Sequence, residues 1–176
     1  MMKKGWCVRL VHAVLLGGLA VATAAPPVRA AEPARHAAFD RLKTLVGSWD
    51  GVADFGKEKV TVTLSIKTIS RGTALMETLT FTGESEMVTV YHPVGDQVML
   101  THYCSSNTQP RMRTDSIPKD VRELFFKFLD ATNMMNSTVT AMHNLKVVFL
   151  SPTQFRQEWY PQDSASQPVV ITYRRK

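Results

Sequence analysis

The stretch with the most varied chemistry runs from residue 86 to residue 112, EMVTVYHPVGDQVMLTHYCSSNTQPRM, and combines imidazole, phenol, thiol and guanidinium groups. An apolar cavity needs only a few such groups to orient a bound molecule. We therefore predict that this stretch supplies the polar part of a ligand site, with His102, Tyr103 and Arg111 as candidate contacts. Because side chains alternate along a strand, His102 and Tyr103 cannot both face the same interior.

Two other kinds of chemistry are conceivable at the same place. His102 and Cys104 are two residues apart and share one face of a strand, so His92, His143 or Glu86 could complete a zinc or copper site with them. A thiolate beside a base could also act as a nucleophile. However, the paired spacing of structural metal sites is missing, and no third residue is identifiable that would orient the base. We predict no metal and no cofactor, and we favour binding over an enzyme activity.

The N-terminus has the features of an export signal. Lys3, Lys4 and Arg9 precede an apolar run over residues 10–25, and Val28-Arg29-Ala30 follows with small or aliphatic residues at the positions a signal peptidase reads. The apolar run is shorter than the roughly 20 residues needed to span a bilayer. We predict a cleaved signal peptide over residues 1–30, no stable membrane anchor after cleavage, and a periplasmic or extracellular location.

Removal of residues 1–30 lowers the net charge of the chain. These residues hold four basic and no acidic side chains, so the formal net charge falls from +6 to +2 in residues 31–176. A domain so close to neutral lacks the basic patch expected of a nucleic-acid-binding protein, and we predict no such partner. Cys104 is then the only cysteine, so no internal disulfide can form. None is required, because a chain of this length can bury about 70% of its surface in one core.

The pattern along residues 31–176 predicts one short helix followed by strands. Apolar residues at spacings of three and four predict a helix within residues 34–46. Val60, Val62, Leu64 and Ile66 then alternate with polar residues, so we expect the first set to point inward and Thr61, Thr63, Ser65 and Lys67 to point outward. Nine further strands are predicted, at residues 49–55, 73–81, 86–91, 98–104, 109–114, 124–129, 145–150, 154–160 and 169–174. Short strands at this spacing indicate a single all-β domain, either an up-and-down barrel or a sandwich.

The hairpin inside the 86–112 stretch has an ambiguous turn. A two-residue turn over Val94-Gly95 would place His92 opposite Gln97 and would force a β-branched residue to a positive φ. In that register Val88, Val90, His92, Met99, Thr101 and Tyr103 share one face, and Met87, Thr89, Tyr91, Val98, Leu100, His102 and Cys104 share the other.

Two sets of motifs in this sequence resemble those of known protein families. A short helix followed by Gly47-Ser48-Trp49 and by basic residues in the last strand resembles the calycin superfamily of lipocalins and fatty-acid-binding proteins. The segments Tyr91-His92, Gly95-Asp96, Leu100 to Cys104 and Gln109 to Met112 resemble a family of exported, lipocalin-like bacterial proteins of uncharacterised function. The resemblance implies a closed antiparallel barrel of about ten strands, with Trp49 at one end under Arg174 or Arg175. We take Gly47, Trp49 and Arg174 as the structural residues of this end.

Three functions fit this fold. The resemblance favours a carrier or sensor of a small apolar or lipid-like ligand, in which Arg111 or Arg113 could bind a carboxylate. The alternatives are a structural or interaction barrel filled by its own side chains, and a metal- or Cys/His-dependent enzyme. A cavity above roughly 300 Å³ would favour binding over the filled barrel.

Overall fold

The computed structural model describes residues 36–115, 121–134, 141–161 and 167–176. The predicted signal peptide, residues 1–30, and the first residues of the predicted helix lie outside these ranges. Within them, no helix is both long enough and apolar enough to cross a membrane.

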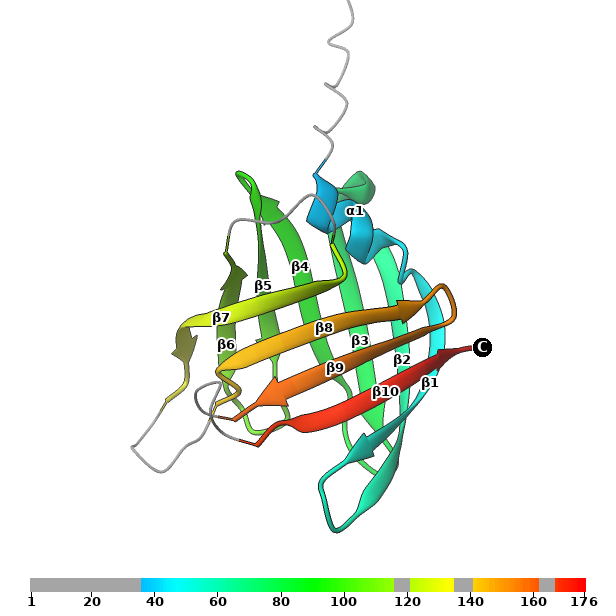
Figure 1. The fold of residues 1–176 in the computed structure, drawn as a ribbon. Coiled ribbons are helices and arrows are strands. Elements are labelled where there is room, and N and C mark those ends of the chain that lie inside the picture. The colour runs from blue at the N-terminus through cyan, green and yellow to red at the C-terminus, as the bar shows by residue number, and fades with distance from the viewer. Residues whose placement is uncertain (1–35, 116–120, 135–140, 162–166) are drawn as a thin grey trace, which may run out of the picture. The chain divides into compact units, whose positions relative to one another are not determined.

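Ten antiparallel strands form a closed barrel in which each strand pairs with its neighbours in sequence and β10 pairs with β1 (Figure 1). The strands are β1 (Gly47–Asp54), β2 (Lys59–Ile69), β3 (Ala74–Phe81), β4 (Met87–Val94), β5 (Gln97–Tyr103), β6 (Gln109–Thr114), β7 (Glu123–Thr132), β8 (Asn144–Ser151), β9 (Gln154–Tyr160) and β10 (Val169–Arg175). The prediction of an all-β up-and-down barrel with about ten strands is confirmed, and the sandwich is excluded. Closure leaves no unpaired sheet edge.

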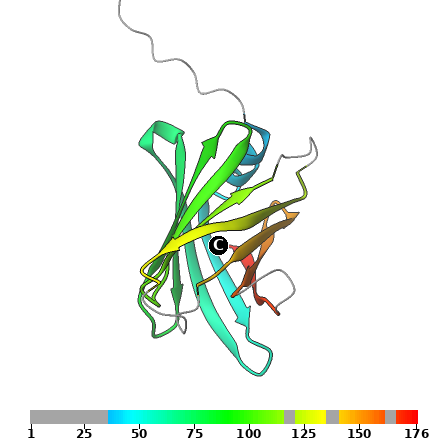
Figure 2. The same cartoon turned by 90° about the vertical axis from the view of Figure 1, so that its left-hand side faces the viewer.

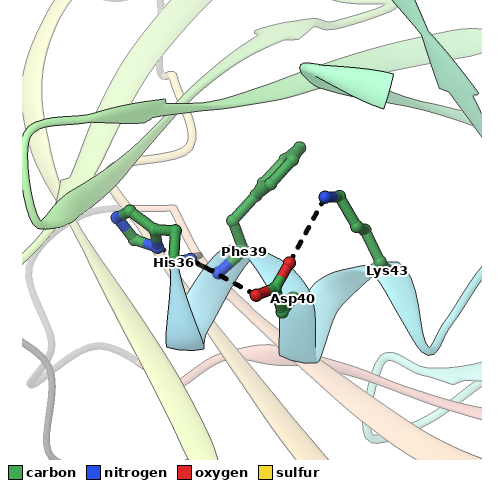
Figure 3. Close-up of polar contacts among 4 residues, drawn as sticks. All are labelled: His36, Phe39, Asp40 and Lys43. Atoms are coloured by element: carbon green, nitrogen blue, oxygen red, sulfur yellow. Dashed lines mark hydrogen bonds and ion pairs between the residues drawn. The ribbon is translucent and has the colours of Figure 1, made fainter. Parts of the chain in front are cut away.

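The helix α1 (Ala37–Lys43) precedes the barrel and is shorter than the predicted range. Its N-terminus is capped by His36, whose Nδ1 accepts a hydrogen bond from the Phe39 N–H at 3.2 Å. Asp40 accepts from the His36 N–H at 3.2 Å and from the Lys43 Nζ at 3.3 Å (Figure 3). Ala38, Phe39 and Leu42 are buried, which gives the helix one apolar face in the common hydrophobic core.

The inward and outward faces of β2 follow the sequence alternation. Val62, Leu64 and Ile66 are buried, whereas Thr61, Thr63, Ser65 and Lys67 are exposed. Val60 is half-buried because it lines a cavity at the end of the barrel. The predicted face assignment of this strand is confirmed.

Trp49 and Arg175 close the barrel on the α1 side. Trp49 is fully buried and its Nε1 donates to the Leu45 carbonyl at 2.8 Å, while the Arg175 guanidinium lies 4.1 Å from the Trp49 ring centroid. Arg175 also donates to the carbonyls of Val46 and Thr44, at 2.9 and 2.8 Å. These bonds fix the connection between α1 and β1 against the last strand.

The choice of Arg174 for this role is wrong, because alternation points Arg174 outward, where it is exposed, and its neighbour Arg175 covers the tryptophan. Gly47 is required for a physical reason. Its φ is +139°, and a Cβ at this position would lie 2.6 Å from the Arg175 Nη1.

The β4–β5 turn consists of Gly95 and Asp96 rather than Val94 and Gly95, because Val94 pairs with Gln97 and His92 pairs with Met99. The predicted register is therefore wrong by two residues. Gly95, with φ +61°, takes the position that would have strained Val94. A shift by two preserves side-chain direction, so the predicted division of β4 and β5 into two faces still holds.

Candidate ligand cavity

The strand order gathers five connections at the barrel end opposite α1, namely β1–β2, β3–β4, β5–β6, β7–β8 and β9–β10. Figure 2 shows the β1–β2 hairpin extending beyond the other strands at this end. A cavity of about 580 Å³ lies within this end of the barrel. Among the described residues it is lined by Phe55, Glu58, Val60, Leu79, Phe81, Thr82, Glu84, Met87, His102, Cys104, Ser105, Met142, Trp159, Val169 and Ile171. Exposed residues such as Phe55, Glu58 and Glu84 form the mouth, and buried residues form the floor.

His102 is the predicted site residue that lines this cavity. Its side chain enters from β5, is 3% exposed, and packs against the Trp159 ring with centroids 4.7 Å apart. The imidazole Nδ1 forms a hydrogen bond with the Thr89 Oγ1 at 2.9 Å, and Nε2 has no partner among the described residues. Burial lowers the pKa of His102 to about 4, so the ring is neutral at pH 7. His102 therefore offers one neutral nitrogen to a bound molecule.

Tyr103 and Arg111 are not brought together with His102. Tyr103 is 52% exposed, because alternation turns it to the outer face when His102 points inward. Arg111 is exposed on the outer face of β6, where its Nε donates to Asp130 at 2.6 Å and its Nη2 contacts the second carboxylate oxygen. This ion pair raises the pKa of Arg111 and lowers that of Asp130, and neither side chain reaches the interior. The predicted three-residue site is thus reduced to His102.

Cys104 shares the inner face with His102 and also lines the cavity, where it is half-buried. His92 lies on the outer face, and His143 stacks on Phe128 with ring centroids 4.3 Å apart. Within the described ranges, no three His, Cys, Asp or Glu side chains come close enough together to hold a metal ion.

A buried carboxylate lies between the cavity and the Trp49 end, and the sequence reading missed it. Glu77 is 2% exposed, and its Oε2 accepts hydrogen bonds from the Tyr91 hydroxyl at 3.0 Å and from the Gln157 Nε2 at 2.9 Å. Its Oε1 has no partner among the described residues, and Glu77 borders a second, very small cavity of about 10 Å³. Burial raises the pKa of Glu77 to about 7, despite the opposing effect of its two hydrogen bonds. The sequence signal was available, since Glu77 occupies an inward position between Leu75 and Leu79.

Gln157 links this carboxylate to the cavity floor. Its Oε1 accepts from the Trp159 Nε1 and from the Tyr173 hydroxyl, both at 3.1 Å. The Trp159 N–H is thereby satisfied within the protein, while the same side chain lines the cavity. Burial is the main cause that raises the pKa of Tyr91 and Tyr173 well above the usual value, so both remain neutral donors. These residues form a polar layer across the middle of the barrel.

No family model matches this sequence, and no curated protein is significantly similar to it. Among solved structures, a redesigned β-barrel is 11% identical, with a TM-score of 0.39, and the match covers 76% of this chain and 93% of that one. A protein of unknown function of the DUF3598 family from Nostoc punctiforme is 15% identical, with a TM-score of 0.40 over 77% of this chain. The chain spans about half the length of that protein, 49%. At these values neither similarity indicates a function for this chain.

Proposed function

We propose that this protein is an exported, calycin-like barrel that binds one small apolar or amphipathic molecule in the cavity. The observation that carries the proposal is the cavity of about 580 Å³, which falls within the range of roughly 300–1,000 Å³ typical of small-molecule sites. Its floor is apolar and aromatic, and His102 contributes a single buried hydrogen-bonding group without charge. This combination is typical of sites that bind a ligand mainly by burying its apolar surface and orient it with a few polar contacts.

The two halves of the barrel differ in a way that supports binding over a structural role. On the α1 side, Trp49, Phe155 and Tyr173 form an aromatic cluster, in which Trp49 meets Phe155 edge-on at a centroid distance of 4.8 Å and Phe155 stacks on Tyr173 at 4.7 Å. On the other side the cavity is bordered by Leu79 and Ile171, which leave it unfilled. Protein interiors are normally close-packed, and atoms facing a void lose their dispersion contacts. A guest that fills the cavity would restore those contacts.

The proposal can be tested with N-phenylnaphthylamine, a neutral apolar fluorophore whose emission increases in apolar surroundings. Val169 lines the cavity, whereas the next residue, Val170, points to the outer face of β10. We expect saturable binding of one fluorophore by the parent and by Val170→Trp, and at least roughly tenfold weaker binding by Val169→Trp, whose indole projects into the cavity and takes up part of its volume. Both variants must retain the parent's circular dichroism spectrum. Equal binding by the two variants would locate the fluorophore elsewhere and refute the proposal.

The exported location is supported by the basic residues, apolar run and cleavage pattern of residues 1–30. Expression of the full chain in a bacterial host should yield a mature protein that begins at Ala31 and is released with the periplasm or the medium. The intact mass of the released protein measures the cleavage point. Full-length protein retained in the cytoplasm would contradict export without affecting the cavity.

A further inference from the structure

We propose that the cavity selects amphiphiles with a cationic or neutral head group over fatty-acid-type carboxylates. This inference rests on the proposed function, because it specifies the ligand class of the same cavity. It follows from the acidic side chains at the mouth of the cavity and from the position of the neighbouring arginines on the outer face of the barrel.

No lysine or arginine is among the described residues that line the cavity. The arginines of the neighbouring walls, Arg111 and Arg113 of β6 and Arg156 of β9, occupy positions that alternate with inward-facing residues and therefore lie outside. A carboxylate bound in the interior would have no cation to pair with. Burial of an ionised group without such a partner is strongly unfavourable.

The buried polar group aimed at the guest is His102, and it is neutral at pH 7. Its free Nε2 can form a hydrogen bond with an alcohol, amine or amide, but it supplies no positive charge for an anion. The rest of the floor, including Leu79, Trp159 and Ile171, is apolar or aromatic. The interior therefore accommodates an uncharged polar group better than a carboxylate.

The mouth of the cavity is acidic and aromatic. Glu58 and Glu84 line it from the β1–β2 and β3–β4 connections, and neither carboxylate has an ion-pair partner among the described residues. Phe55 and Phe81 lie between these connections, with ring centroids 6.1 Å apart. Carboxylates attract an ammonium group by charge, and aromatic faces attract it through cation–π interactions.

The charged residues of the five connections at this end also make the electrostatic potential at the cavity mouth negative. The described part of these connections, residues 55–58, 82–86, 104–108, 133–134, 141–143, 161 and 167–168, contains three acidic side chains and one basic side chain, Lys57. Lys57 is exposed and does not line the cavity. An approaching anion is therefore repelled and a cation is attracted at low ionic strength.

The test compares dodecylammonium, dodecanol and dodecanoate at neutral pH, each below its micelle concentration, as competitors of N-phenylnaphthylamine. The three probes share one tail and differ in the head group. We expect dodecylammonium and dodecanol to displace the fluorophore at concentrations at least roughly tenfold lower than dodecanoate does. The variant Glu58→Gln/Glu84→Gln should weaken dodecylammonium several-fold without affecting dodecanol, whereas Glu86→Gln, whose side chain does not line the cavity, should weaken dodecylammonium much less and leave dodecanol unchanged.

The outcomes separate the two proposals. Equal or stronger displacement by dodecanoate, with the fluorophore bound, overturns the inference and leaves the proposed function intact. Unchanged dodecylammonium binding in the double variant likewise overturns it. If the fluorophore and all three probes fail to bind, the proposed function fails and the inference fails with it.

Discussion

Replacement of Glu77 by glutamine should make the stability of the protein less sensitive to rising pH. Glu77 is fully enclosed and its pKa is raised from 4.5 to about 7, so the folded state binds a proton more tightly than the unfolded chain does. The resulting stabilisation is complete below pH 4.5 and is lost as the pH rises through 7. Glutamine stays neutral at every pH, and its carbonyl can still accept from Tyr91 and Gln157.

The size of the effect follows from the shift in pKa. One pKa unit corresponds to about 1.4 kcal/mol, so the shift of Glu77 amounts to about 3 kcal/mol of folding free energy lost between pH 4.5 and about pH 8. His102 acts in the opposite direction, because its pKa is lowered from 6.5 to about 4 and its stabilisation is lost as the pH falls through that window. The pH profile of the parent alone therefore mixes two opposed effects, and the difference between parent and variant isolates Glu77.

The assay is urea unfolding followed by tryptophan fluorescence at several values between pH 4.5 and about pH 8. We expect Glu77→Gln to match the parent at the acid end and to exceed its free energy of unfolding by about 3 kcal/mol at the basic end. Glu86→Gln, at an exposed position, serves as the control for a change in net charge and should show no such trend. A difference between Glu77→Gln and the parent that stays constant across the pH range would refute the assignment of Glu77 as a buried titrating group.

Three further predictions test the ends, walls and cavity of the barrel. Arg175→Ala should lower the free energy of unfolding by about 2 kcal/mol, through loss of the contact with the tryptophan ring and of two carbonyl hydrogen bonds, whereas Arg174→Ala should change it by less than about 0.5 kcal/mol. Thermal unfolding of this charge-matched pair measures the contrast, and equal effects would contradict the role of Arg175. Val62→Asp should unfold or aggregate the protein by burying an unpaired charge, whereas Thr63→Asp should be tolerated; solubility and circular dichroism distinguish the two outcomes. In residues 31–176, where Cys104 is the only cysteine, maleimide labelling of Cys104 should slow several-fold at saturating N-phenylnaphthylamine, and an unchanged rate would place the fluorophore outside the cavity.

The strands could be predicted from the sequence because a half-buried wall imposes a period of two on the residue types. The predicted limits of β6 and β9 agree with the structure to the residue, and both strands carry clear alternation. The β4–β5 turn was misplaced because Val94-Gly95 and Gly95-Asp96 are both short and both use the same glycine. Hydrogen bonding along the whole hairpin, which the sequence does not reveal, decides between them.

The candidate site was predictable only in part, because alternation states which residues share a face and leaves open which face is inside. His102 and Cys104 were correctly grouped, but both faces of β4 and β5 are apolar enough to be the inner one. Arg111 was attractive as an anion ligand, yet its partner Asp130 lies on the neighbouring strand in a pairing that contains a bulge. Alternation with Leu75 and Leu79 indicates an inward position for Glu77, but the sequence does not show that Tyr91 and Gln157 supply the hydrogen bonds to its carboxylate.

Native mass spectrometry of the exported protein and of its Val169→Trp and Val170→Trp variants tests most directly whether the cavity of about 580 Å³ holds a guest. The parent, incubated with N-phenylnaphthylamine or freshly isolated with its natural ligand, should carry one added non-covalent mass. Val170→Trp should carry the same mass, and Val169→Trp should carry it at much lower occupancy. Bare spectra for all three proteins, or the same added mass on all three, would contradict a ligand-binding cavity.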